Sequence, residues 1–142
     1  MWIRSVENKL REVKPTTTPH LLSVYIGQTK ELGLPKDQKE WKNYQKYALE
    51  PWEFCKRNGL YPDTILIDGR FRAACCLATL LFADAGSRIL VDDYVERKNY
   101  HVVERYVPRS KTIGRMVEFI VPDALPRDEI WIALIRCLAD VW

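Results

Sequence analysis

The sequence has few glycines, and its cysteines show no metal-binding pattern. Six glycines occur in 142 residues, and no two stand close enough together for the glycine-rich turns that hold phosphates or dinucleotides. The four cysteines form no CxxC pair and no cluster with either histidine, which argues against a zinc site. Cys75 and Cys76 fall in an apolar helical pattern, so we expect them to be buried, reduced thiols.

Long apolar runs and runs of like charge are also missing. No apolar stretch approaches the ~20 residues that a membrane-spanning helix needs, and charge appears too early in the chain for a secretory signal. The 22 basic and 19 acidic residues are interspersed and give a net charge of +3. We therefore expect a cytoplasmic protein with no membrane partner and no nucleic-acid partner, folded as a single domain over residues 1–142.

The first half of the chain shows helical and strand-like patterns in turn. Apolar residues recur at helical spacing over residues 2–14, and the apolar residues 21–26 suggest a short buried strand. Asp37 and Glu40 have the spacing of a capping box and predict a helix that begins there. Pro51 should kink that helix or split it, and Asn58 with Gly59 should end it.

The second half predicts an α/β fold. Residues 64–67 and 89–91 are continuous apolar runs, typical of parallel strands covered on both faces, and residues 71–82 between them predict an amphipathic helix. A helix over residues 95–106, a strand over 116–121 and an apolar helix over 128–142 should follow. Sequential strands joined by helices favour a mostly parallel sheet.

Acidic residues follow both central strands. Asp68 follows the first, and Asp92 and Asp93 follow the second, so three carboxylates should meet at the carboxyl edge of the sheet, where open α/β sheets bind ligands. Carboxylates that lie so close together raise one another's pKa unless a positive group lies between them. It could be a divalent metal ion such as Mg²⁺ or, more simply, Arg70 and Arg72, whose place in the first turn of a helix calls for a nearby anion.

Two ordinary structural roles compete with these readings. Asp92 or Asp93 could cap the helix that follows. His101, one helical turn after Arg97, could act as a general base, although a surface histidine on an amphipathic helix is the commoner case. The sequence leaves both alternatives open.

The segments Asp63-Thr64-Ile65-Leu66-Ile67-Asp68-Gly69-Arg70 and Ile89-Leu90-Val91-Asp92-Asp93 resemble the fourth and fifth strands of class I S-adenosylmethionine-dependent methyltransferases. The resemblance implies a Rossmann-like three-layer α/β/α fold with the strand order 3-2-1-4-5-7-6. It further implies a small-molecule substrate and the cofactor S-adenosylmethionine, with Asp68, Gly69 and Arg70 binding it. The catalytic residues would be Asp68, Asp92 and His101. The relatives of catechol O-methyltransferase bind magnesium at the positions of Asp68, Asp92 and Asp93.

The glycine-rich turn of that family has no counterpart here, so the resemblance covers the C-terminal half of the fold. We expect a truncated domain with an incomplete sheet, inactive or weakly active by itself. The alternatives are a non-catalytic binding or assembly module and, less favoured, a metal-dependent hydrolase. The open strand over residues 64–67 should pair with residues 21–26 or be covered by a partner chain. The final helix predicts a homodimer.

Overall fold

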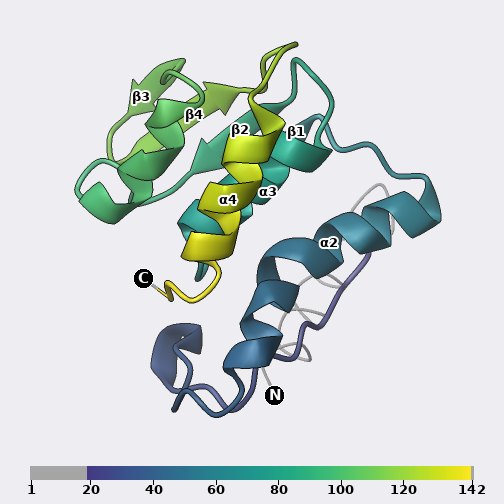
Figure 1. Cartoon of the computed structure of the whole chain (residues 1–142), viewed down its shortest axis with the longest axis vertical. Coiled ribbons are helices and arrows are strands. Elements are labelled where there is room, and N and C mark those ends of the chain that lie inside the picture. The colour runs from purple at the N-terminus through teal and green to yellow at the C-terminus, as the bar shows by residue number, and fades with distance from the viewer. Residues whose placement is uncertain (1–18, 142) are drawn as a thin grey trace.

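The computed structural model describes residues 19–141, which form a mixed α/β fold (Figure 1). The longer helices are α2 (Tyr44–Asn58), α3 (Arg72–Phe82) and α4 (Arg127–Cys137), and the 3-10 helices are η1 (Glu31–Gly33), η2 (Trp41–Asn43) and η3 (Lys98–Arg105). The strands are β1 (Thr64–Ile67), β2 (Arg88–Val91), β3 (Lys111–Ile113) and β4 (Met116–Ile120). The helix expected over residues 2–14 lies outside the described residues.

The four strands form one sheet in the order β1-β2-β4-β3. β1 and β2 are parallel, as predicted, with Ile65 opposite Ile89. β4 runs antiparallel to both of its neighbours, β2 and β3. The sheet is therefore mixed rather than mostly parallel, although β3 runs in the same direction as β1 and β2.

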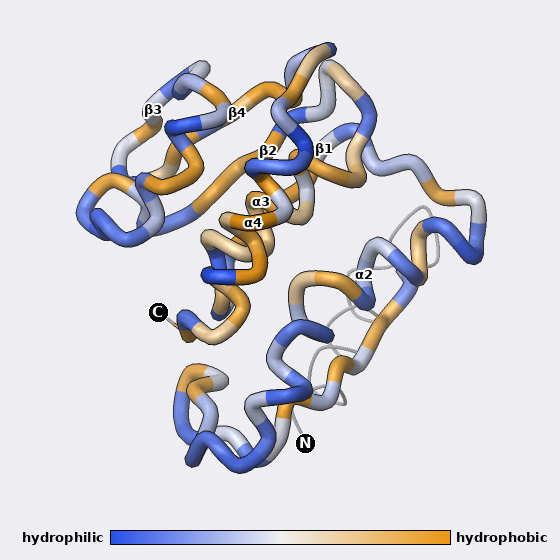
Figure 2. The backbone as a smooth tube through the Cα atoms, viewed as in Figure 1, coloured by the Kyte–Doolittle hydropathy of each residue, from blue (hydrophilic) through white to orange (hydrophobic). Residues whose placement is uncertain are grey.

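One face of the sheet carries the hydrophobic core. On this face β1, β2 and β4 contribute buried side chains, among them Ile67, Ile89 and Phe119. α3 packs on this face, and α2, α4 and η3 all contact α3. Hydrophobic residues are concentrated in α3 and in the strands β2 and β4 (Figure 2).

The opposite face of the sheet is more open. Leu66 is 61% exposed there, and the Arg88 guanidinium forms an ion pair across the strands with Glu118 at 2.6 Å. Among residues 19–141, helices cover the face that carries α3, so the three-layer arrangement expected from the resemblance is not confirmed. Within the same residues, no helix is long and apolar enough to cross a bilayer.

The region before β1 differs from the sequence prediction. Residues 21–26 do not join the sheet. Among the described residues β1 is an edge strand, and the strand that pairs with it is β2. The predicted pairing of residues 21–26 with β1 is wrong for the described structure. In that segment Ile26 is buried while Tyr25 is 60% exposed, so its apolar side chains serve local packing rather than a strand.

The helix predicted to begin at Asp37 begins later. Asp37 Oδ1 accepts a hydrogen bond from Lys39 N–H at 2.9 Å, which is a local turn rather than a helix cap. The α-helix starts at Tyr44 and continues through Pro51. Gly59 ends it in a left-handed conformation (φ 62°), as its position after Asn58 predicted.

Two further predictions need correction. The predicted helix over residues 95–106 is shorter and has 3-10 geometry, as η3. β3 was not predicted, because all of its residues are exposed and so carry no hydrophobic pattern. The final helix is not buried all round: Ile130 and Leu134 face the core, whereas Ile132 is 53% exposed and Ile135 is 65% exposed.

Candidate ligand site at the carboxyl edge of the sheet

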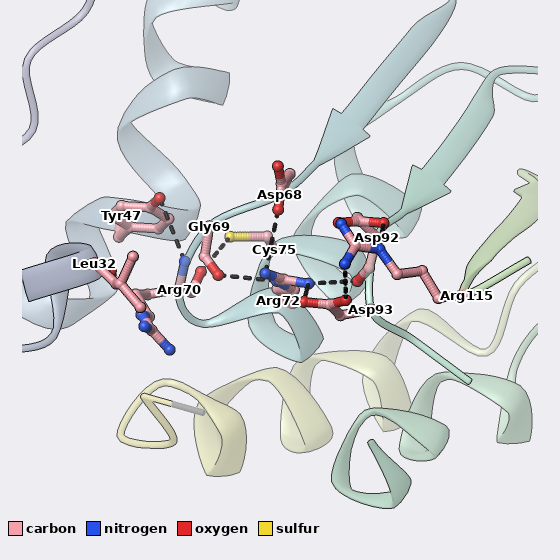
Figure 3. A network of polar contacts seen from close by, with 10 residues as sticks. All are labelled: Leu32, Tyr47, Asp68, Gly69, Arg70, Arg72, Cys75, Asp92, Asp93 and Arg115. Atoms are coloured by element: carbon pink, nitrogen blue, oxygen red, sulfur yellow. Dashed lines mark hydrogen bonds and ion pairs between the residues drawn. The ribbon is translucent and has the colours of Figure 1, made fainter. Parts of the chain in front are cut away.

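Asp68, Arg72, Asp92, Asp93 and Arg115 meet at the carboxyl end of β1 and β2, and we call this group the carboxyl-edge cluster. The parallel pairing of β1 and β2 places the three aspartates at the same edge of the sheet. Figure 3 shows the Arg72 guanidinium between Asp68 and Asp93, with the Arg115 guanidinium beside Asp92 and Asp93. The sequence predicted the meeting of the aspartates and one of the two arginines.

Arg72 holds the cluster together from the first residue of α3. Its Nη2 lies 3.2 Å from Asp68 Oδ1 and its Nη1 lies 3.5 Å from Asp93 Oδ2. It also donates hydrogen bonds from Nε to the carbonyl of Gly69 at 2.9 Å and from Nη1 to the carbonyl of Asp92. Because Arg72 is 8% exposed, these contacts form a largely buried clamp between the ends of β1 and β2. A positive charge in the first turn of a helix is unfavourable unless an anion lies nearby, and Asp68 and Asp93 are the anions that stabilise Arg72 there.

Arg115 completes the charge balance from the turn between β3 and β4. Its Nε and Nη2 donate to the two carboxylate oxygens of Asp92 at 3.0 and 2.8 Å, and its Nη1 lies 3.2 Å from Asp93 Oδ1. These contacts raise the pKa of Arg115, first through the hydrogen bond to Asp92. Arg115 was not predicted from the sequence as a member of this cluster. Gly114 directly before it marks a turn, but nothing in the sequence pattern directs that turn toward Asp92.

Arginine side chains, rather than a metal ion, balance the negative charge of the three aspartates in this structure. No group of three or more His, Cys, Asp or Glu side chains among the described residues is arranged to hold a metal ion. The predicted magnesium site formed by Asp68, Asp92 and Asp93 is therefore not supported, because guanidinium groups occupy the positions beside these carboxylates.

Two residues in left-handed conformations shape the chain at this edge. Phe71, just before α3, has φ 55°, and Asp93 has φ 52°. This conformation costs roughly 1 to 2 kcal/mol for a residue other than glycine, least for Asp or Asn. The Phe71 ring is 1% exposed and packs against Tyr44 and Tyr47 at ring distances of 5.3 and 5.5 Å. This packing offsets the backbone cost.

A cavity of about 660 Å³ runs along β1 and ends at Asp68, Gly69 and Arg70. Its volume lies within the range of small-molecule sites, roughly 300 to 1,000 Å³. The apolar walls include Val24, Trp52 and Cys55. The three residues that the resemblance assigns to the cofactor thus line the polar end of one cavity.

Tyr47 on α2 closes this polar end beside Gly69 and was not singled out from the sequence. Its hydroxyl accepts a long hydrogen bond from Arg70 N–H at 3.5 Å, and a Cβ on Gly69 would clash with it. Burial raises the pKa of Tyr47, so the hydroxyl stays protonated at neutral pH. Its hydrogen has no acceptor among the described residues, which leaves a donor at the cavity. The Arg70 guanidinium is turned toward η1, where Nε donates to the carbonyl of Leu32 at 3.0 Å.

Asp68 can also accept a hydrogen bond from a ligand. Its side chain is 56% exposed, and Arg72 contacts its Oδ1. The other carboxylate oxygen, Oδ2, has no partner among residues 19–141 and remains an acceptor. Asp68 therefore provides one acceptor and Tyr47 one donor at the end of an apolar cavity, on either side of the Gly69 backbone.

His101 belongs to a different cluster. Its ring stacks on Tyr94 at 5.1 Å, and its neighbours are Glu104, with Nδ1 to Oε1 at 3.9 Å, and Arg109, with Nε2 to Nη2 at 3.5 Å. Within the described part of the chain, no hydrogen bond or ion pair joins His101 to Asp68 or Asp92. The structure does not bring the three predicted catalytic residues together.

A methyltransferase-like protein from Silicibacter pomeroyi DSS-3, with a crystal structure at 1.80 Å resolution, has a similar fold, with a TM-score of 0.84. The two sequences are 32% identical over 98% of this chain and 72% of that one. No protein-family model and no curated protein matches the chain. An identity of 32% over this length shows a common family as well as a common fold. The chain therefore belongs to the same methyltransferase-like family as the Silicibacter pomeroyi protein.

Proposed function

We propose that this protein is a class I S-adenosylmethionine-dependent methyltransferase whose carboxyl edge binds one side of the cofactor. The observation that carries the proposal is that Asp68, Gly69 and Arg70 line the polar end of a single cavity in a methyltransferase-like fold. The order of the strands also supports it. β1, β2, β4 and β3, with β4 reversed, correspond to the fourth, fifth, seventh and sixth strands of the class I order.

The residues at the cavity suit the polar groups of this cofactor. The free oxygen of Asp68 accepts from an ammonium or hydroxyl group, and the Tyr47 hydroxyl donates to a carboxylate or ring nitrogen. The apolar wall with Val24 and Trp52 suits the less polar part of the molecule. When bound, S-adenosylmethionine supplies an electrophilic methyl group, and the task of this chain is to hold it in line with a small-molecule acceptor. We expect little turnover by the chain alone, because it has no glycine-rich turn to fix the cofactor.

Calorimetric titration with S-adenosylmethionine tests the proposal. We expect weak binding by the full chain that is unchanged by magnesium. Asp68→Asn should lower the affinity about tenfold or more, since a hydrogen bond to a charged group contributes roughly 1.5 to 3 kcal/mol. Asp84→Asn is the matched control, because Asp84 is an exposed carboxylate before the amino end of β2, away from the cavity. Circular dichroism establishes that both variants are folded.

Two results would contradict the proposal. The first is the absence of binding at millimolar cofactor by a chain with native circular dichroism. The second is binding that Asp68→Asn leaves unchanged. Either result would favour the non-catalytic binding module, which the largely apolar cavity along β1 also suits.

A further inference from the structure

The Arg70 guanidinium is held in place but has no anionic partner. Its Nε donates to the carbonyl of Leu32 at 3.0 Å, and Figure 3 shows the guanidinium turned away from Asp68, beside Leu32. Its Nη1 and Nη2 form no hydrogen bond or ion pair with the described residues. Glu31, the acidic residue of η1, forms no ion pair with it either. Both terminal nitrogens of Arg70 are therefore free to donate to a ligand.

The position of Arg70 calls for an anion that the described chain does not supply. Arg70 lies two residues before the first residue of α3, where the partial positive charge of the helix N-terminus opposes a cation. For Arg72, which begins α3, Asp68 and Asp93 are the anions nearby. Since no described acidic residue does the same for Arg70, the missing anion is one that a ligand can provide.

Leu32, which holds the Arg70 guanidinium, lies in a strained turn. It has φ 56° and ψ 23°, and it is 85% exposed. The turn is braced by hydrogen bonds from Lys36 N–H to the carbonyl of Gln28 at 2.8 Å and from Lys30 N–H to the carbonyl of Leu34 at 2.6 Å. A residue with a side chain keeps this conformation only where the contacts around it determine it, and such residues are common at functional sites. The braced turn thus fixes the position of the guanidinium.

A second cavity, of about 650 Å³, lies beside the same loop. Its apolar walls include Pro35, Trp41, Tyr44, Ala139 and Val141. Trp41 is 59% exposed, and Tyr44 packs against Phe71, the neighbour of Arg70, with ring centroids 5.3 Å apart. Through Phe71, and through the loop that joins Leu32 to Pro35, this aromatic wall and the free guanidinium belong to one region of the molecule.

We propose that Arg70 and the second cavity bind a small aromatic carboxylate, and that this ligand is the methyl acceptor. The guanidinium matches a carboxylate with two parallel hydrogen bonds, and one arginine balances its single charge better than the roughly two charges of a phosphate group. The ring of the ligand would pack against Trp41, as aromatic side chains pack against one another. The assignment of the ligand as the acceptor rests on the proposed function, whereas the binding of the carboxylate does not.

The guanidinium lies outside the cavity that we assign to the cofactor. Arg70 meets that cavity through its backbone N–H, which contacts the Tyr47 hydroxyl, and no residue of η1 lines it. The Phe71 ring packs against Tyr47, which lines the cofactor cavity, and against Tyr44, which lines the second one. The two cavities are therefore neighbours with separate walls, and both ligands can be bound at once, as transfer between them requires.

The probe is phenylacetate, and phenylacetamide, its neutral amide, is the matched ligand. Each is titrated into the full chain without cofactor and followed by calorimetry and by tryptophan fluorescence. We expect phenylacetate to bind with a stoichiometry of one to one and to change the fluorescence. The amide should bind at least about tenfold more weakly, because it lacks the charge that Arg70 binds.

Two variants test the residues. Arg70→Gln should weaken the binding of phenylacetate at least about tenfold and leave the binding of phenylacetamide unchanged. Arg57→Gln is the matched control, because Arg57 Nε also donates to a backbone carbonyl, that of Glu53 at 3.4 Å, and Arg57 lines neither cavity. Trp41→Leu should weaken the binding of both ligands and abolish the fluorescence change.

Three results would overturn the proposal: no binding of phenylacetate at tens of millimolar, equal affinities for phenylacetate and phenylacetamide, or binding that Arg70→Gln leaves unchanged. If Arg70→Gln does not fold, the comparison of the two ligands on the wild-type chain still decides. The titrations contain no cofactor, so their outcome is separate from the Asp68→Asn test of the proposed function. Binding of S-adenosylmethionine without binding of phenylacetate would refute the second site alone. The reverse result would keep the carboxylate site and refute its assignment to a methyl acceptor.

Discussion

Replacing Arg72 by Met tests whether the buried guanidinium joins the ends of β1 and β2. Met keeps a hydrophobic stem of similar length and removes the charge and the donors. The backbone carbonyls of Gly69 and Asp92 lose their partner, at a cost of roughly 1 to 3 kcal/mol for each carbonyl that stays dry. Asp68 is 56% exposed and regains water, so the loss of its ion pair adds little. We expect Arg72→Met to lower the free energy of unfolding by about 2 to 4 kcal/mol.

Arg115→Lys is the matched control, because Arg115 contacts Asp92 and Asp93 in the same cluster from a side chain that is 67% exposed, and lysine keeps a positive charge beside the largely buried Asp92 carboxylate. We expect Arg115→Lys to lower the free energy of unfolding by about 0 to 1 kcal/mol, the range of exposed ion pairs, which salt screens. Urea denaturation at low and at high salt measures both variants, with the slope of the transition checked for constancy. A loss below about 1 kcal/mol for Arg72→Met, or equal losses for the two variants, would refute the clamp role of Arg72.

Three further predictions concern the rest of the molecule. Burial raises the pKa of Cys75 to about 12 from an ordinary value of 9.0, so the folded chain retains a proton that the unfolded chain loses, and stability should fall as pH rises above about 9, by less in Cys75→Ala. The hydrogen bonds from Arg88 lower the pKa of Glu118, whose contribution to stability is present above its unfolded pKa and is lost as pH falls through the folded value. Thermal unfolding followed from neutral to acid pH should therefore show a shallower loss for Glu118→Gln than for the wild type. The homodimer through α4 stays a prediction: sedimentation should find a dimer that Ile135→Asp dissociates, and a monodisperse wild-type monomer at micromolar concentration would exclude it.

The strands β1 and β2 and the helix α3 were predicted correctly, because each has a local hydrophobic pattern that allows a single type of secondary structure. The strands β1 and β2 contain the apolar runs of residues 65–67 and 89–91, each bounded by polar residues, and the helix between them has one continuous apolar face. Their order makes the strands parallel, and this alone brings Asp68 and Asp92 to one edge. The cluster of acids could therefore be predicted before the structure.

The predictions from the sequence fail where the conformation of a segment, or the position of a side chain, depends on residues far away in the sequence. Residues 21–26 have a strand-like composition, but a strand needs a neighbouring edge, and the chain places a cavity between Leu22 and β1. In η3 the buried residues Tyr100 and Val103 stand three apart, a spacing that suits both an α-helix and a 3-10 helix. Arg115 reaches Asp92 through the pairing of β4 with β2, which no local pattern encodes.

The backbone strain in the described chain bears on where a ligand would bind. The left-handed residues Phe71 and Asp93 each lie shortly after a strand that ends in the carboxyl-edge cluster. Glycine would relax both turns, but it would remove the Phe71 ring from its contacts with Tyr44 and Tyr47 and the Asp93 carboxylate from Arg72 and Arg115. Strain of this kind persists only where surrounding contacts determine the conformation, and it is common at functional sites. Since the Phe71 ring also packs against Tyr47, which lines the polar end of the cavity, the strained turn helps to fix the donor that we assign to the ligand.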